Sequence, residues 1–214
     1  MNLQRRTLTA AIALAPALPR VASAQSPVAG TEYREVKPTV ATDSGSKVEV
    51  LEFFQYSCPH CFSFAPAIHD WSKKVPADVA FKRVSINWDN STVNHTKTYY
   101  ALEQLGKVDD VHAKFFSAIH TNRRRLLDPN EITDFMAGNG IDKQKWLDAF
   151  NSFTVNTRVG KAAQLWRAYK IDGTPAIGID GKFVTAPSMA KGQKESLAVT
   201  DFLVNRSRKE RGGK

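Results

Sequence analysis

The sequence contains only two cysteines, Cys58 and Cys61, among its 214 residues. This small number excludes a framework of structural disulfides. Beyond the first twenty or so residues no apolar run is long enough to cross a bilayer, and no internal period indicates a repeat architecture. With 42% hydrophobic residues and 10 prolines the chain is not of the disordered class. What remains is a chain that can bury a sizeable core, as one domain or as a domain with an insertion.

The first 24 residues have the pattern of an export signal. Arg5-Arg6 precedes an apolar run from Leu8 to Leu18, and Ala22-Ser23-Ala24 matches a small-residue cleavage site. A buried N-terminal helix is the alternative, but the run is short and has no polar face. We therefore predict a signal peptide that is cleaved near Ala24 and an exported mature protein, with the general and the twin-arginine export routes both open. An exported protein passes into an oxidising compartment, where two leftover thiols are a liability unless they are the working part of the protein.

Positive charge is moderate and local. The net charge of +9 falls to +6 without the three arginines of the signal, which leaves 27 basic and 21 acidic residues. The basic clusters at 123–125 and 206–214 have no aromatic residues interleaved with them. We expect a solvated face or a frayed terminus at these clusters, and no binding of nucleic acid.

The order of the expected elements indicates an α/β fold. After a polar leader over residues 25–46, the β-branched and aromatic segment 47–54 predicts a strand that leads directly into the cysteines. A helical pattern at 62–75 follows, and then a second strand at 79–86. Strand, helix and strand in this order predict a parallel, right-handed unit, which we assign to a first part of the core domain at 47–89.

Residues 90–169 show helical periodicity only. Helices are expected at 98–105, 108–120, 129–139, 143–150 and 156–169. Eighty residues are far more than one crossover helix needs, so we predict a helical domain inserted into the α/β core, with its last helix returning to the core. The second part of the core, at 170–214, contains a predicted hairpin at 176–185 and a closing helix at 193–206.

The two cysteines form the sequence Cys58-Pro59-His60-Cys61 at the junction of a strand and a helix. The first turn of a helix has unpaired N–H groups and a positive dipole end, which stabilise a thiolate at Cys58. Pro59 suits the first helical position, and His60 can add positive charge or a donor beside the sulfur. Cys61, one turn into the helix, is expected to be less accessible and to resolve the mixed disulfide. The sequence therefore predicts a redox-active cysteine pair in which Cys58 is the cysteine that reacts with the substrate.

A metal site is the alternative for a C-x-x-C pair, because such a pair can be half of a zinc centre. No second cysteine pair exists, and the five histidines are scattered singly. We therefore expect no metal, although an exported protein that holds Cu(I) or Zn(II) through the same cysteines stays open as a rival.

Val50-Leu51-Glu52-Phe53-Phe54 followed by Cys58-Pro59-His60-Cys61 closely resembles the DsbA family of bacterial periplasmic thiol oxidases. The resemblance covers roughly Val48 to the end of the chain, and it implies a thioredoxin fold with an inserted helical domain. It also implies oxidation of cysteine pairs in unfolded exported proteins, without a dissociable cofactor, and reoxidation by a DsbB-type membrane quinone reductase. We expect a monomer with a shallow apolar groove near Cys58. A periplasmic reductase or isomerase is the alternative within the same chemistry.

Further site residues follow from this resemblance. Thr174-Pro175 fits the loop with a cis proline that faces the cysteines, where Thr174 would offer backbone hydrogen bonds to a client peptide. The usual family pattern has valine before this proline, and a proline that merely starts a strand is the alternative. Glu52 is either a solvent-facing residue or, as the resemblance implies, a buried acid that assists proton transfer, with Arg83 beside it.

Five aromatic residues near the site are assigned to the core, without a function. They are Phe53, Phe54, Trp71, Phe81 and Trp88.

Overall fold

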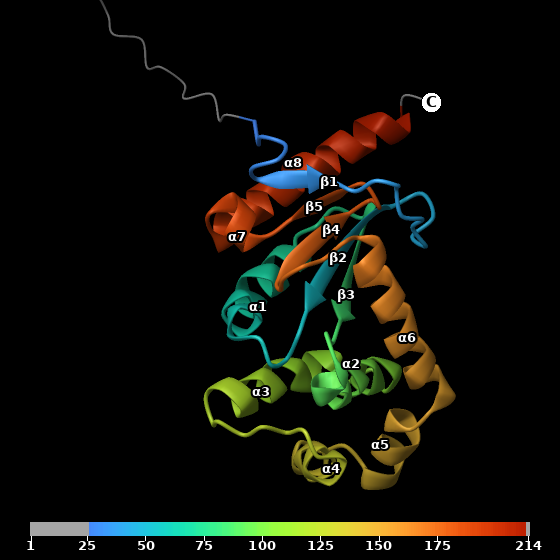
Figure 1. The fold of residues 1–214 in the computed structure, drawn as a ribbon. Coiled ribbons are helices and arrows are strands. Elements are labelled where there is room, and N and C mark those ends of the chain that lie inside the picture. The colour runs from blue at the N-terminus through green and yellow to red at the C-terminus, as the bar shows by residue number, and fades with distance from the viewer. Residues whose placement is uncertain (1–25, 213–214) are drawn as a thin grey trace, which may run out of the picture.

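The computed structural model describes residues 26–212. The predicted signal peptide lies outside the described residues. Within the described part the fold is mixed α/β, with one five-stranded sheet and helices around it (Figure 1). No helix of this part is long and apolar enough to span a membrane. The predicted fold class is therefore confirmed.

The sheet has the strand order β1-β5-β4-β2-β3. The strands are β1 Tyr33–Glu35, β2 Val48–Phe54, β3 Val79–Ser85, β4 Ala176–Ile179 and β5 Phe183–Thr185. β2 pairs with β3 in parallel, as the strand-helix-strand pattern predicts, and with β4 in antiparallel orientation. Every residue of β2 is buried, which is expected for a strand between two neighbours that is covered on both faces. This central strand carries the chain to the cysteines.

Eight α-helices and one 3-10 turn surround the sheet in the part of the chain that the structure describes. They are α1 Pro59–Ser72, α2 Val93–Gln104, α3 Val108–His120, α4 Pro129–Gly138, α5 Lys143–Phe150, α6 Phe153–Ala168, α7 Pro187–Ala190 and α8 Gln193–Gly212, and a 3-10 turn, η1, covers Asn90–Thr92. Figure 1 shows α2 to α5 gathered at the end of the sheet where β2 and β3 stop, while α6 runs back beside the sheet. Local caps start several of these helices: Asp128 accepts the N–H of Asn130 at 2.8 Å, and Ser152 accepts the N–H of Val155 at 3.1 Å.

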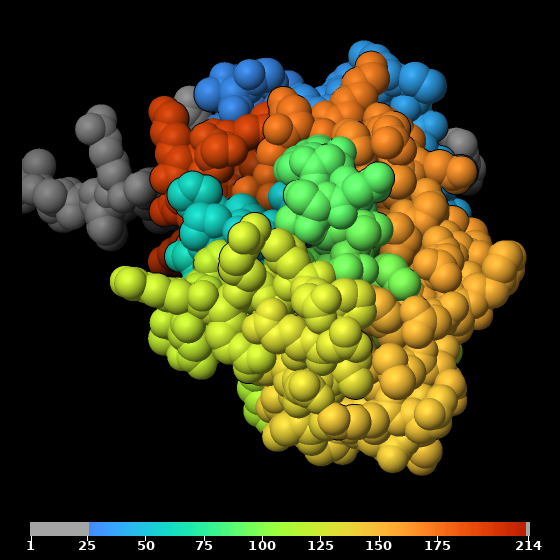
Figure 2. Space-filling model, turned by 60° about the horizontal axis from the view of Figure 1, so that its bottom comes forward, coloured from blue at the N-terminus to red at the C-terminus, as the bar shows by residue number. Residues whose placement is uncertain are grey.

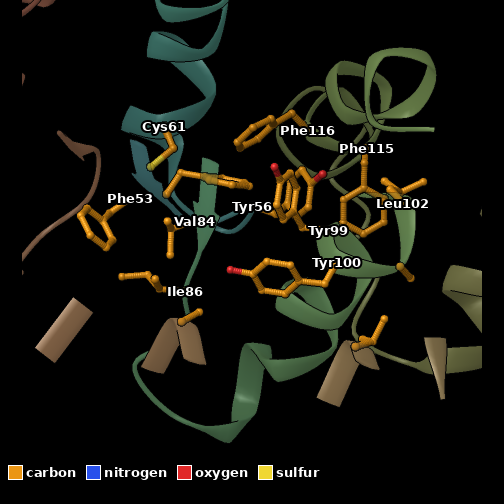
Figure 3. Close-up of a cluster of buried hydrophobic side chains, with 14 of the residues drawn as sticks. Phe53, Tyr56, Cys61, Val84, Ile86, Tyr99, Tyr100, Leu102, Phe115 and Phe116 are labelled. Atoms are coloured by element: carbon orange, nitrogen blue, oxygen red, sulfur yellow. The ribbon is translucent and has the colours of Figure 1, made fainter. Parts of the chain in front are cut away.

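The core has two clusters, one on each side of the sheet. The larger cluster joins the sheet to the helical insertion and is rich in aromatic side chains, and Figure 3 shows Tyr56, Tyr99 and Phe116 lying close together in it. Tyr56 is fully buried and its ring centroid lies 4.8 Å from that of Phe116. Burial of large side chains stabilises a fold by about 1.5–3 kcal/mol each, so the helical insertion is held to the sheet by a continuous core.

Three sequence expectations need correction. The polar leader contains β1, which pairs with β5 at the edge of the sheet. Trp88, which we assigned to the core, is 41% exposed, because it lies after the end of β3, where its ring makes an edge contact with Trp166 at 4.9 Å between ring centroids. Trp71 and Phe81 are only partly buried, whereas Phe53 and Phe54 are fully buried as predicted.

The third correction concerns the basic C-terminal cluster, whose residues 206–212 are part of α8 and have specific acidic partners. Arg208 pairs with Asp78 at 2.6 Å, and Arg206 pairs with Glu210 at 3.0 Å. Arg211 pairs with the buried Asp180, which follows β4. The pairs with Asp78 and Asp180 therefore join this helix to the residues that flank β3 and β4.

Candidate active site

The cysteine pair lies at the junction that the sequence predicts. β2 ends at Phe54, and the N–H of Cys58 donates to the carbonyl of Gln55 at 3.2 Å, which closes a turn before the helix. Cys58 is the N-cap residue of α1, and Pro59 follows at the first helical position. The N–H of Cys61 donates to the sulfur of Cys58 at 3.4 Å. The cap oxygen of an ordinary helix is thus replaced by a sulfur that receives the same donor.

A second segment reaches the sulfur from the far end of the chain. Ala176 of β4 pairs with Phe53 of β2, so the residues just before β4 lie beside the end of β2. The Thr174–Pro175 peptide bond in this loop is cis. The thiol of Cys58 donates to the Thr174 carbonyl at 3.3 Å. The loop therefore faces the cysteine pair.

The two thiols have opposite electrostatic environments. Hydrogen bonding from the Cys61 thiol, the Thr174 side chain and the backbone of Cys61 and His60 outweighs partial burial and lowers the pKa of Cys58 to about 5. Cys61 is fully buried, and burial together with the neighbouring Cys58 sulfur raises its pKa far above the ordinary range. Only Cys58 is therefore a thiolate near neutral pH.

Glu52 lies buried in the middle of β2, with 2% of its surface exposed. Its register partner on β3 is Arg83, whose Nε donates to the carboxylate at 3.0 Å. Burial raises the pKa of Glu52 to about 6, although Arg83 acts in the opposite direction. The alternative of a solvent-facing Glu52 is wrong. Its role in proton transfer stays a prediction, because no hydrogen bond joins Glu52 to either sulfur in residues 26–212.

His60 is exposed, and its imidazole forms no hydrogen bond with a sulfur in the part of the chain that the structure describes. A hydrogen bond from the His60 backbone helps to lower the pKa of Cys58, whereas the His60 side chain does not contribute to this shift. It lines a cavity of about 320 Å³ together with Thr174, Pro175, Met189 and Arg34. This cavity lies where we expected a shallow groove near Cys58.

A second cavity, of about 350 Å³, lies on the other side of α1, between α1 and α3. Its lining includes Phe62, Phe116, His112 and the Arg83 that binds Glu52. Figure 2 shows the face of the molecule where the start of α1 (cyan) lies beside the segment after β3 (green).

Sequence reasoning gave no role to Tyr56, His112 and His120, which the structure brings together beside the cysteine turn. The hydroxyl of Tyr56 forms a hydrogen bond with Nδ1 of His112, and the backbone carbonyl of Tyr56 accepts one from Nε2 of His120; both histidines belong to α3. A spacing of eight residues places both histidines on one face of a helix, and this was the only signal in the sequence.

Among residues 26–212, no group of three or more His, Cys, Asp or Glu side chains is placed to hold a metal ion. The two cysteines are free thiols.

Comparison with known proteins identifies the family. Residues 49–195 match the model of the DSBA-like thioredoxin domain. The chain is 38% identical over 201 residues to the thiol:disulfide interchange protein DsbA of Pseudomonas aeruginosa, which covers 94% of this chain and 95% of that protein. It is 40% identical over 203 residues to the protein of the same name from Bordetella parapertussis, with 94% and 96% covered.

Solved structures agree with this match. The crystal structure of Pseudomonas aeruginosa DsbA superposes with a TM-score of 0.84 at 38% identity, over 86% of this chain and 96% of that one. Xylella fastidiosa DsbA gives a TM-score of 0.80 at 28% identity, over 86% and 99%. The sheet with its inserted helical domain is thus a thioredoxin fold of this type. The chain belongs to the DsbA family of thiol:disulfide oxidoreductases.

Proposed function

We propose that the protein oxidises pairs of cysteines in exported proteins through a disulfide between Cys58 and Cys61. A client thiolate attacks the sulfur of Cys58, a mixed disulfide forms, and Cys61 leaves with the electron pair of the broken bond and takes up a proton. A second client thiolate then attacks the client sulfur of the mixed disulfide and releases Cys58 as a thiolate. The client is oxidised by two electrons, and the cysteine pair is reduced by two.

The observation that carries this proposal is the low pKa of Cys58, about 5, beside a buried Cys61 whose pKa is raised. A thiolate that is stabilised only in the reduced form favours reduction of the pair, which makes its disulfide a stronger oxidant. A low pKa also makes Cys58 a good leaving group in the second step.

The client site is the cavity beside the cis proline. The Thr174 backbone lies next to Cys58 and can pair with an extended peptide in the manner of a strand. The side chain of Met189 adds a flexible apolar wall, which suits clients of varied sequence.

The place of action is the periplasm, and reoxidation is by a DsbB-type membrane quinone reductase. The export pattern of the first 24 residues and the family of the chain support this assignment. We expect a monomer that needs no dissociable cofactor, since the electrons reside in the two sulfurs.

The test is the redox equilibrium of the purified protein against glutathione, with the thiolate absorbance of Cys58 titrated on the same sample. We expect a potential well above the glutathione poise, together with an acidic Cys58. Cys61→Ser, first oxidised at Cys58 as a mixed disulfide with glutathione, should exchange the glutathione for a reduced client peptide and retain that peptide as a mixed disulfide, whereas Cys58→Ser should not. A potential near that of thioredoxin, about −270 mV, would show a reductase instead.

A further inference from the structure

His120 of α3 binds the turn that precedes Cys58. Its Nε2 lies 2.8 Å from the carbonyl oxygen of Tyr56, and because a carbonyl only accepts, Nε2 carries the proton. The ring of the same histidine stacks on Phe62, with 5.0 Å between centroids and 13° between the planes. One side chain of the helical insertion thus contacts the residue two before Cys58 and the residue after Cys61.

The other end of Tyr56 is fixed by the same helix. Burial raises the pKa of the Tyr56 phenol, which keeps its proton. It donates this proton to Nδ1 of His112 at 2.8 Å, because burial lowers the pKa of His112 to about 3 and leaves its imidazole neutral. The ring of Tyr56 is also fully buried among aromatic neighbours. His120 in turn binds the carbonyl of its peptide group, so α3 contacts both the side chain and the backbone of Tyr56.

The position of this peptide bears directly on the sulfur of Cys58. Tyr56 is in the middle of the turn closed by the bond from Cys58 to Gln55. The contacts that lower the pKa of Cys58 include the N–H of Cys61, which lies 3.4 Å from the Cys58 sulfur. Contacts of this length are easily lost on a small displacement of the turn. A disulfide requires the two sulfurs to approach to about 2.05 Å, so the reduced arrangement is a distinct geometry that can be favoured on its own.

We propose that His120 is a positioning residue of the redox site, which holds the turn 55–58 in the arrangement that stabilises the reduced pair. It does not touch the reacting atoms. It acts through the Tyr56 carbonyl, and it makes the redox properties of the cysteines depend on a contact with the helical insertion. The inference rests on the thiol–disulfide exchange proposed above.

The test compares His120→Leu, which has no donor, with His120→Gln, whose amide can donate from a similar position. The matched control is Asn94→Leu, because Asn94 is also half-buried and its amide donates to a loop carbonyl, that of Leu127, at 2.9 Å within the helical insertion. Each variant is equilibrated with glutathione, its Cys58 thiolate is titrated, and its stability to urea is measured.

We expect His120→Leu to shift the equilibrium constant about fivefold toward the oxidised protein, the effect of one net hydrogen bond, and to raise the pKa of Cys58. The equilibrium constant of His120→Gln with glutathione should stay within about twofold of the wild-type value. Asn94→Leu should be less stable to urea, with an unchanged equilibrium constant. An unchanged equilibrium constant in His120→Leu, or an equal shift in His120→Gln, would overturn the proposal.

If His120→Leu does not fold, His120→Asn takes its place, because its shorter amide does not reach the Tyr56 carbonyl. The equilibrium constant expected for His120→Leu, and the result that would overturn the proposal, then apply to His120→Asn. The result is read as a difference between variants in one buffer. A wild type with a reducing potential therefore refutes the proposed function, while the comparison of variants separately tests the positioning role.

Discussion

The acidity of Cys58 predicts a specific pH dependence of stability in the reduced protein. The pKa of this thiol falls from an ordinary 9.0 to about 5 on folding, and the group is half-buried. A depressed pKa contributes stability that is fully present above the unfolded pKa and is lost as the pH falls through the folded one. At about pH 7 the thiolate contributes about 2.7 kcal/mol before solvent screening. Because the sulfur is half exposed, we take about half of this, roughly 1.3 kcal/mol.

The control must remove a second titration with the opposite sign. The pKa of Glu52 is raised to about 6 by burial, so its contribution is present below 4.5 and is lost as the pH rises through about 6. Cys58→Ser retains Glu52 and lacks the thiolate. The quantity of interest is therefore the unfolding free energy of the reduced wild type minus that of reduced Cys58→Ser.

Urea denaturation under reducing conditions measures this difference. It should rise by roughly 1.3 kcal/mol between about pH 4 and about pH 7. A difference that is flat over this range would show that Cys58 has the same ordinary pKa in the folded and the unfolded protein, and it would refute the electrostatic reasoning.

Three further predictions concern the surroundings of the site. The unfolding free energy of the wild type minus that of Glu52→Gln should fall by about 2 kcal/mol as the pH rises from about 4 to about 7, and a constant difference in urea titrations would mean that Glu52 ionises freely. Arg211→Gln should cost about 1–2 kcal/mol because it removes one cationic partner of the buried Asp180, whereas Lys37→Gln, in an exposed pair with Glu35, should leave the unfolding free energy nearly unchanged in the same assay. Gly178→Ala should lower stability by about 1–3 kcal/mol, because its added carbon would lie 2.6 Å from the ring of Tyr169, and an unchanged thermal midpoint would contradict this packing.

Much of the site was predictable because its signals are local. The strand before Cys58 has a β-branched and aromatic pattern, and Pro59 marks the first turn of the helix. The predicted bounds of α3 and α5 agree with the structure, since each is a short amphipathic segment with a clear start. These features depend on neighbours within a few positions along the chain.

The parts that sequence reasoning missed depend on contacts far along the chain. β1 is three residues in a polar segment, and it is a strand because β5 offers it backbone partners. The arginine tail reads as a solvated terminus until Asp78 and Asp180 are known to lie beside it. His120 reads as an ordinary helical histidine, since nothing local indicates that Tyr56 is opposite it.

The opposite pKa shifts of the two cysteines also determine when Cys61 can react. The pKa of Cys61 is raised first by burial, and further by its hydrogen bond to the Cys58 sulfur and by the charge of that sulfur. In a mixed disulfide Cys58 has no charge, so the last two causes vanish while the Gln55 backbone and the Thr174 side chain still favour the Cys61 thiolate. Cys61 is therefore a stronger nucleophile while a client is attached than in the free reduced protein. If the second thiol of a client is slow to attack, Cys61 attacks the Cys58 sulfur of the mixed disulfide instead. The client then leaves with its thiol still reduced, and the Cys58–Cys61 disulfide forms again and can react with another client.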